Sequence, residues 1–326
     1  MRQLGVSTTA WAINVAAAAF GLLIWIAGRR LPPLTRRGPR ALLTAAAIAA
    51  ILLPFASEGM LGVHRWVPVG GLRLHASAIV APLIILCVAA AASHGIGTAL
   101  AISTACATIL ALQPDAAQTT SLAAACAVVL VCTRPMHEAL PSVALLLAVS
   151  GASFIRHDPL PPVAHVEEIF GIVASRGAGW AAMATAALLL LPVPFFAAWY
   201  RHRHPAALAL GVYVAGTILA PAWGTFPVPV MGSGASPILG YFIALAVWPA
   251  GRVRPTKRDH RTVHHHDAVP GRPTRGAKAH GSIFVRHGLP FEVTGAEQLE
   301  GRVAARPSSP PNCRPVRHPP GGQERA

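Results

Sequence analysis

The sequence predicts an all-α, polytopic membrane protein of about nine transmembrane helices, followed by a disordered tail. Three observations lead to this prediction. Apolar residues make up 53% of the 326 residues and charged residues only 12%, which is far from the composition of soluble domains. Apolar runs of membrane-spanning length recur along the first 250 residues. The first of these runs lacks a signal-peptide cleavage pattern and reads as a true span.

The nine predicted spans are several apolar runs separated by short polar connections. They occupy about residues 9–28, 40–57, 76–93, 95–112, 117–132, 139–155, 178–200, 205–223 and 234–250. Several are short and rich in Ala, Gly and Ser, which suits close helix packing in lipid. We therefore expect a transmembrane domain over residues 1–250.

Residues 251–326 have a different composition, rich in Pro, Gly, Arg and His. Such a segment cannot bury enough apolar surface to fold, so we expect a disordered tail. The histidine run His264–His266 has no scaffold around it and is a weak metal motif. The five cysteines show neither paired nor metal-ligand spacing.

The formal net charge is +15, but its distribution argues against nucleic acid as a partner. Of the 27 Lys and Arg residues, 14 lie after residue 250, and most others lie in short loops. If nine spans alternate, the basic loops 29–40 and 201–204 and the start of the tail share one side. The positive-inside rule makes that side the cytoplasm. The N-terminus is then predicted to be outside, and the C-terminus cytoplasmic.

The acidic residues of the first 250 positions follow the opposite distribution. There are six, and this topology places all but Glu138 on the outer face: Glu58, Asp115, Asp158, Glu167 and Glu168. Arginines and histidines share those outer loops, which points to binding or chemistry at the outer surface. The alternative is that outer loops merely carry fewer Lys and Arg.

The best candidate site lies in the outer segment Pro159–Arg176. It opens with a Pro-rich run that cannot be helix interior and continues as a short amphipathic helix. Glu167 and Glu168 lie side by side on it, and His165 comes two residues earlier. These carboxylates are candidates for general base chemistry. The alternative is a solvated face of an interfacial helix, with His165 serving only to cap or pack.

Three outer-face motifs occur in order. Gly62–Gly70 reads GVHRWVPVG, Leu112–Asp115 reads LQPD, and Leu160–Phe170 reads LPPVAHVEEIF; a weaker one, Pro227–Ser236, follows. Together they resemble the SEDS family (FtsW, RodA and SpoVE), whose motifs are G-x-x-R-W-I-x-L-G, L-Q-P-D, L-P-x-x-H-T-D-F-I-F and P-L-P-F-x-S-Y-G-G-S. The resemblance covers roughly residues 10–250.

The resemblance implies a SEDS-like helical bundle in the bacterial cytoplasmic membrane, acting in cell wall synthesis, cell shape or division. It implies a peptidoglycan glycosyltransferase that polymerises lipid II, the lipid-linked precursor, at the outer face. A transpeptidase (penicillin-binding protein) is the implied partner, besides the lipid membrane. Glu167 stands at the position of the family's key aspartate.

The chain also departs from the family. Ala78 and Ala81 replace the glutamate of Q-P-S-E and a lysine, and Ser175-Arg176 replaces an acidic pair. The long cytoplasmic region between the second and third motifs shrinks to 133–138, and one N-terminal span of the family's ten is expected to be missing. These losses favour a second function, a non-catalytic membrane partner of cell-wall enzymes. A flippase or transporter is a third, but the spans hold few of the ionisable residues it needs.

Glycosyl transfer from a lipid pyrophosphate requires a base for the acceptor hydroxyl and positive charge for the leaving group. Glu167 is the predicted base, with Glu168 raising its pKa by like-charge repulsion. The predicted substrate-binding residues are Arg65, Trp66, Arg73, Asp115, Arg156 and His165. No cofactor is firmly implied, although a divalent cation such as magnesium could replace arginine at the pyrophosphate. The alternatives are that Arg65–Trp66 is an interface anchor and that Asp115 is a turn residue or helix N-cap.

Overall fold

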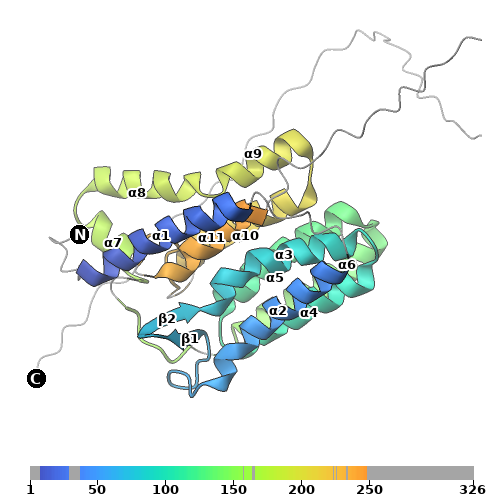
Figure 1. Cartoon of the computed structure of the whole chain (residues 1–326), viewed down its shortest axis with the longest axis horizontal. Helices are drawn as coiled ribbons and strands as arrows, with labels where there is room; N and C mark the ends of the chain where they lie inside the picture. The colour runs from blue at the N-terminus through green and yellow to red at the C-terminus, as the bar shows by residue number, and fades with distance from the viewer. Residues whose placement is uncertain are drawn as a thin grey trace, which may run out of the picture. The chain divides into compact units, whose positions relative to one another are not determined.

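The computed structural model describes residues 8–28, 37–156, 158–163, 166–222, 224, 226–232 and 234–247. Within these ranges the protein is a bundle of apolar helices with one small β-hairpin (Figure 1). The all-α polytopic fold class is confirmed. His165 and the predicted tail, 251–326, lie outside the described residues.

Each predicted span coincides with helix in the described part of the chain. The helices are α1 (Thr8–Gly28), α2 (Arg37–Leu52), α3 (Ala76–Ala92), α4 (Ile96–Leu112), α5 (Ala116–Thr133), α6 (Met136–Ser153), α8 (Ala178–Leu190), α9 (Val193–His202), α10 (Pro205–Leu219) and α11 (Ala235–Val247). Six segments among the described residues are long and apolar enough to cross a membrane, and α8 with α9 counts as one of them. The helices α3, α4 and α11 are apolar but shorter.

The span predicted at 178–200 is not one continuous helix. It breaks between α8 and α9, where Leu191 and Pro192 separate the two helices. Pro192 precedes the first turn of α9 and Pro194 lies within it. A proline lacks the backbone N–H that a helix interior needs and clashes with the preceding turn, so the break falls at this pair.

The helix α3 lies at the centre of the bundle and packs against α2, α4, α5, α10 and α11. Small residues bring the neighbours close. A Cβ placed on Gly240 of α11 would overlap the carbonyl oxygen of Ala78, and one on Gly216 of α10 would lie 2.9 Å from the hydroxyl of Ser121. The small-residue packing expected from the composition is therefore present.

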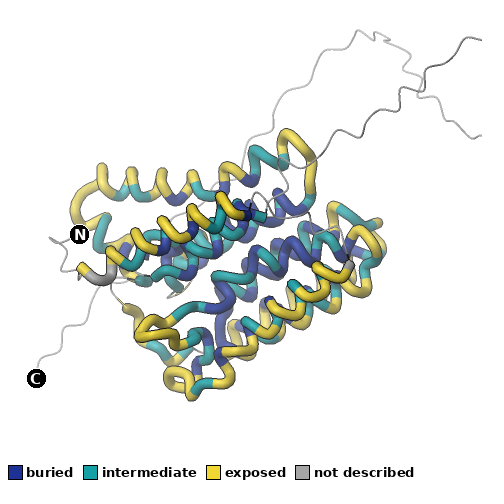
Figure 2. The backbone as a smooth tube through the Cα atoms, in the orientation of Figure 1, coloured by how far each residue is buried: buried dark blue, intermediate teal, exposed yellow. Residues whose placement is uncertain are grey.

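Large apolar side chains cover the outside of the bundle. Figure 2 shows exposed residues along the outer faces of α1, α2 and α8 and buried residues on α3 and α5. Leu42 is 73% exposed, and Trp180 and Leu190 are 58% and 64% exposed. Such a surface is stable in lipid rather than in water, so these helices associate with a membrane.

The connection from α2 to α3 contains structure that the sequence interpretation missed. After the 3₁₀ turn η2 (Leu53–Ala56), strands β1 (Trp66–Val69) and β2 (Leu72–His75) form an antiparallel hairpin. Its two-residue loop, Gly70–Gly71, has φ values of 53° and 85°. Two positive φ angles match a type I′ turn, which glycine adopts without strain.

The segment predicted as an amphipathic helix forms only one and a half turns, α7 (Ile169–Ala174). The Pro-rich run before it is non-helical, as expected. Ile169 is buried against Leu188 of α8 and Val228, whereas Phe170 is exposed. The N–H of Val228 donates to the carbonyl of Val166 at 3.2 Å, so this segment is tied to the connection that follows the 3₁₀ turn η3 (Ala220–Ala222).

Candidate functional site

The polar residues of interest lie at the end of the bundle that carries the hairpin (Figure 1), which we call the hairpin end. Consecutive helices run back and forth, so the connections 53–75, 113–115, 154–177 and 220–234 lie at this end. The connections 93–95, 134–135 and 203–204 lie at the opposite end. Which end faces the cytoplasm stays a prediction.

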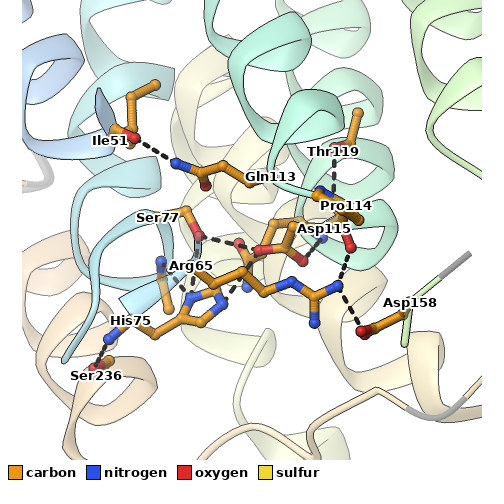
Figure 3. Close-up of polar contacts among 12 residues, drawn as sticks. Ile51, Arg65, His75, Ser77, Gln113, Pro114, Asp115, Thr119, Asp158 and Ser236 are labelled. Atoms are coloured by element: carbon orange, nitrogen blue, oxygen red, sulfur yellow. Dashed lines mark hydrogen bonds and ion pairs between the residues drawn. The ribbon is translucent and has the colours of Figure 1, made fainter. Parts of the chain in front are cut away.

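Arg65 precedes β1 and is nearly fully buried, with 5% of its surface exposed. Its Nη2 lies 2.8 Å from Oδ2 of Asp158, in the connection after α6 (Figure 3). The same nitrogen donates to the carbonyl of Pro114. Arg65 thus joins three segments that are far apart in the sequence, and Asp158 balances its charge.

Asp115 is the N-cap of α5 and is almost completely buried. Its Oδ1 accepts from the N–H of Gln118 at 3.3 Å, while its Oδ2 lies 3.2 Å from Nε2 of His75 and 3.5 Å from the hydroxyl of Ser77. Burial alone would raise the pKa of Asp115, but His75, Arg65 and the Gln118 N–H together lower it. This carboxyl is therefore held in its ionised form.

His75 connects the hairpin to two helices. It ends β2 and is the N-cap of α3, where its Nδ1 accepts from the N–H of Ala78. The backbone N–H of His75 donates to the hydroxyl of Ser236 in α11 at 2.8 Å. Because Nδ1 accepts a hydrogen bond, Nε2 carries the proton that points at Asp115.

Arg65, Ser77 and Asp115 are buried, and together with the half-buried His75 and Asp158 they form one polar centre. We call this set of five residues the polar centre.

Glu167 precedes α7 and is half-buried. Its Oε2 accepts from the N–H of Val163 at 2.8 Å, which fixes the turn ahead of α7. Burial is the main reason that the pKa of Glu167 is raised; the Val163 N–H and Arg65 lower it, and Asp158 raises it. The fields of Arg65 and Asp158 therefore both reach this carboxyl.

The expected role of Glu168 beside Glu167 stays a prediction. Its carboxylate is exposed, it makes no side-chain cap on α7, and it is not among the causes of the raised pKa of Glu167. The like charge that acts on Glu167 is that of Asp158.

The other predicted substrate-binding residues are not all gathered at the polar centre. Arg73, on β2, is exposed and lines an open cavity together with Trp66. Arg156 is exposed, and its Nη1 donates to the carbonyl of Leu112 at 2.7 Å, where α4 ends. Arg156 thus caps a helix C-terminus in this structure.

The sequence interpretation named Arg65 and Asp115 as site residues but missed their partners Asp158 and His75, and Ser236, which accepts from the N–H of His75. The signal for two of them was present. His75 and Asp158 are ionisable residues in connections at the hairpin end, next to the motif positions Ser77 and Leu160. Ser236 was part of the weakest motif. Among the residues that the structure describes, no group of three or more His, Cys, Asp or Glu side chains could hold a metal ion.

Comparison with known proteins yields similarity at the level of structure. No family model and no curated protein sequence matches the chain. The rod shape determining protein RodA of Thermus thermophilus matches with a TM-score of 0.55 and 17% identity over 75% of this chain and 87% of that one. A point mutant of the same RodA matches with a TM-score of 0.56 at the same identity, over 75% and 88%.

The chain has a SEDS-like fold. This likeness agrees with the expected bundle. At this identity it shows the fold alone.

Proposed function

We propose that this protein is a SEDS-like membrane protein of cell wall synthesis that polymerises lipid II at the outer face of the cytoplasmic membrane, with Glu167 as the general base. One observation carries the proposal. Glu167, which the sequence resemblance puts at the family's acidic position, is half-buried in this RodA-like fold, has a raised pKa and is acted on by the charges of Arg65 and Asp158. A carboxylate in such surroundings is a stronger base than an exposed one.

In this reaction the Glu167 carboxylate takes the proton of the acceptor hydroxyl. The acceptor oxygen forms the new glycosidic bond to the anomeric carbon of the donor as that carbon's bond to the lipid pyrophosphate breaks. The pyrophosphate departs with both electrons of the broken bond and requires positive charge nearby. Of the predicted arginines, Arg65 is the one whose charge acts on Glu167, so Arg65 is the candidate for this contact.

The test is polymerisation of lipid II by the purified full chain in detergent or liposomes. We expect Glu167→Gln to lower the rate by about 10²- to 10⁴-fold, the usual contribution of a general base. Glu138→Gln, in the first turn of α6 at the opposite end, is the matched control and should keep the wild-type rate. A Glu167→Gln variant as active as the wild type, or a wild type that makes no glycan where a related enzyme does, contradicts the proposal.

A second function, a non-catalytic membrane partner of cell-wall enzymes, is favoured by the packing around α3. Ala78 and Ala81 replace ionisable residues of the family and are 5% and 0% exposed. Gly240 of α11 closes over the Ala78 carbonyl. At these positions small side chains pack between helices where the family has ionisable side chains. Capture of a transpeptidase that survives Glu167→Ala, together with no glycan product, supports this function; no capture counts against it.

A further inference from the structure

The hairpin end contains an open cavity of about 230 Å³ that the polar centre does not use. Its walls come from the segment after η2 and from both strands of the hairpin. The segment after η2 contributes Glu58, Met60 and Val63 to the walls, and the hairpin contributes Trp66 and Arg73. We infer that this cavity binds a single sugar ring of the glycan, away from the bond that reacts. The inference rests on the proposed function and names a binding subsite for it.

Two charged side chains line the cavity, and Nη1 of one of them, Arg73, lies 2.5 Å from Sδ of Met60, which lines the same cavity. Glu58 and Arg73 line the same space, yet among the described residues neither belongs to an ion pair. Both side chains belong to exposed residues. The cavity thus offers a carboxylate that accepts hydrogen bonds and a guanidinium that donates them, and a sugar ring carries hydroxyl groups that can do both.

The apolar wall complements these charges. The indole of Trp66 is half-buried, and Val63 lies beneath the cavity, nearly fully buried. A flat aromatic ring suits the C–H face of a pyranose, while its hydroxyls reach the polar groups at the rim. Drug-sized ligands fill pockets of roughly 300–1,000 Å³. A cavity of about 230 Å³ is smaller and fits one ring rather than an extended chain.

The cavity is also connected to the polar centre. Trp66 directly follows Arg65, and its ring meets the ring of His75 edge-on with centroids 5.8 Å apart. His75 in turn contacts Asp115. A sugar held on Trp66 therefore lies next to the polar centre, where it would fix the position of the glycan.

The experiment measures binding of chitotriose, a trimer of N-acetylglucosamine, to the full chain in detergent by calorimetry or saturation-transfer NMR. We expect Glu58→Gln, Arg73→Gln and Trp66→Phe each to raise the Kd by about tenfold, since each removes a charged hydrogen bond or stacking area. The matched controls at the opposite end, Glu138→Gln and Arg201→Gln, should leave the Kd unchanged. Circular dichroism of each variant checks that the helices are retained.

The outcomes separate this inference from the proposed function. Lipid II polymerisation without chitotriose binding, or binding that all three cavity variants leave unchanged, overturns the sugar site but not the enzyme. Chitotriose binding that depends on the cavity, in a protein that makes no glycan, supports the site and overturns the enzyme. Inorganic pyrophosphate is the second probe. Suppose that Arg73→Gln abolishes pyrophosphate binding, while Glu58→Gln and Trp66→Phe leave the Kd of chitotriose unchanged. That result would assign the cavity to the pyrophosphate instead of a sugar.

Discussion

The two ends of the bundle place arginine in different surroundings. At the hairpin end, Arg65 is buried and paired with the carboxylate of Asp158 at 2.8 Å. At the opposite end, Arg40 donates to the carbonyl of Ala90 at 3.0 Å and Arg134 donates to the carbonyl of Ala92. Both of these carbonyls belong to the last turn of α3.

Arg40 and Arg134 bind backbone carbonyls and have a structural role, whereas Arg65 pairs with a carboxylate and can influence acid–base chemistry. The carbonyls of a helix C-terminus have no partner within the helix, and cations near them stabilise the negative end of its dipole. Arg40 and Arg134 therefore fasten α2 and the α5–α6 connection to α3. Arg65 at the hairpin end instead faces carboxyl groups whose ionisation depends on pH and on one another. The following changes test whether the two ends are as different as their contacts indicate.

The largest effect is expected at Asp115. Asp115→Asn keeps an acceptor for the Gln118 N–H but removes the charge that faces His75 and Arg65. Breaking a buried charged network costs about 3–5 kcal/mol, because the remaining charge is left uncompensated. Unfolding of the detergent-solubilised protein, followed by circular dichroism, measures the loss. Glu138→Gln at the opposite end is the control, and an equal loss in both variants would remove the distinction between the ends.

The same substitution changes the pH dependence of stability. The folded-state pKa of Asp115 is below its ordinary value of 3.8, so its ionised form contributes stability above that value. That contribution is lost as the pH falls through the lowered pKa. The wild type should therefore lose more stability than Asp115→Asn over this acidic range, and parallel curves would contradict the lowered pKa.

The next effect is expected where α3 and α11 meet, below the polar centre. Gly240→Ala forces a methyl group onto the Ala78 carbonyl and moves α11, which also carries the Ser236 hydroxyl that His75 contacts. Overpacking of this kind costs about 1–3 kcal/mol. Gly151→Ala in α6, where a Cβ meets no atom within 4 Å, is the matched control and should be neutral or stabilising. Equal stability of the two variants would show that the helices can separate freely.

The fold was largely predictable because long apolar runs mark helices in lipid by composition alone. Pro192 and the Gly70–Gly71 pair are signals in the sequence for the helix break and for the hairpin turn. The interpretation followed the apolar composition on either side of them and therefore predicted neither feature. The RodA-like arrangement of the helices followed from a resemblance in four short motifs rather than from any physical pattern. The orientation across the membrane and the tail remain predictions.

The candidate site was predictable only in part. Arg65 and Asp115 lie in recognisable motifs, whereas their partners Asp158 and His75 lie 93 and 40 residues away in the sequence and are set by how the connections meet in space. Sequence proximity suggested Glu168 as the partner of Glu167, but burial and Asp158 perturb that carboxyl instead. A neighbour in sequence says little about the electrostatic neighbour when the chain turns between them.

A smaller effect is expected on the pH profile of activity, through Asp158. Asp158→Asn removes a negative charge near Glu167 and leaves Arg65 less compensated, and both changes lower the pKa of Glu167. A base must be deprotonated to act, so the rising limb of the polymerisation rate should move to lower pH. The rate of lipid II polymerisation against pH measures this shift. Glu138→Gln should leave the rising limb at the wild-type pH. A limb that moves to higher pH in Asp158→Asn would refute the claim that the charge of Asp158 raises the pKa of Glu167.

The smallest effect is expected at the opposite end. Arg134→Gln removes the guanidinium that donates to the Ala92 carbonyl, and a cation at a helix C-terminus is worth about 0.3–1 kcal/mol. Unfolding in detergent should show a loss of this size, while lipid II polymerisation and its pH profile should stay as in the wild type. Arg65→Gln is the paired variant from the hairpin end, where the same change of residue type also unbalances Asp158 and Asp115. A cap on a backbone carbonyl has no titrating partner whose ionisation it could change, so Arg134→Gln should not alter the pH profile of polymerisation. If it altered that profile as Arg65→Gln does, Arg134 and Arg65 would not differ in the role of their charge.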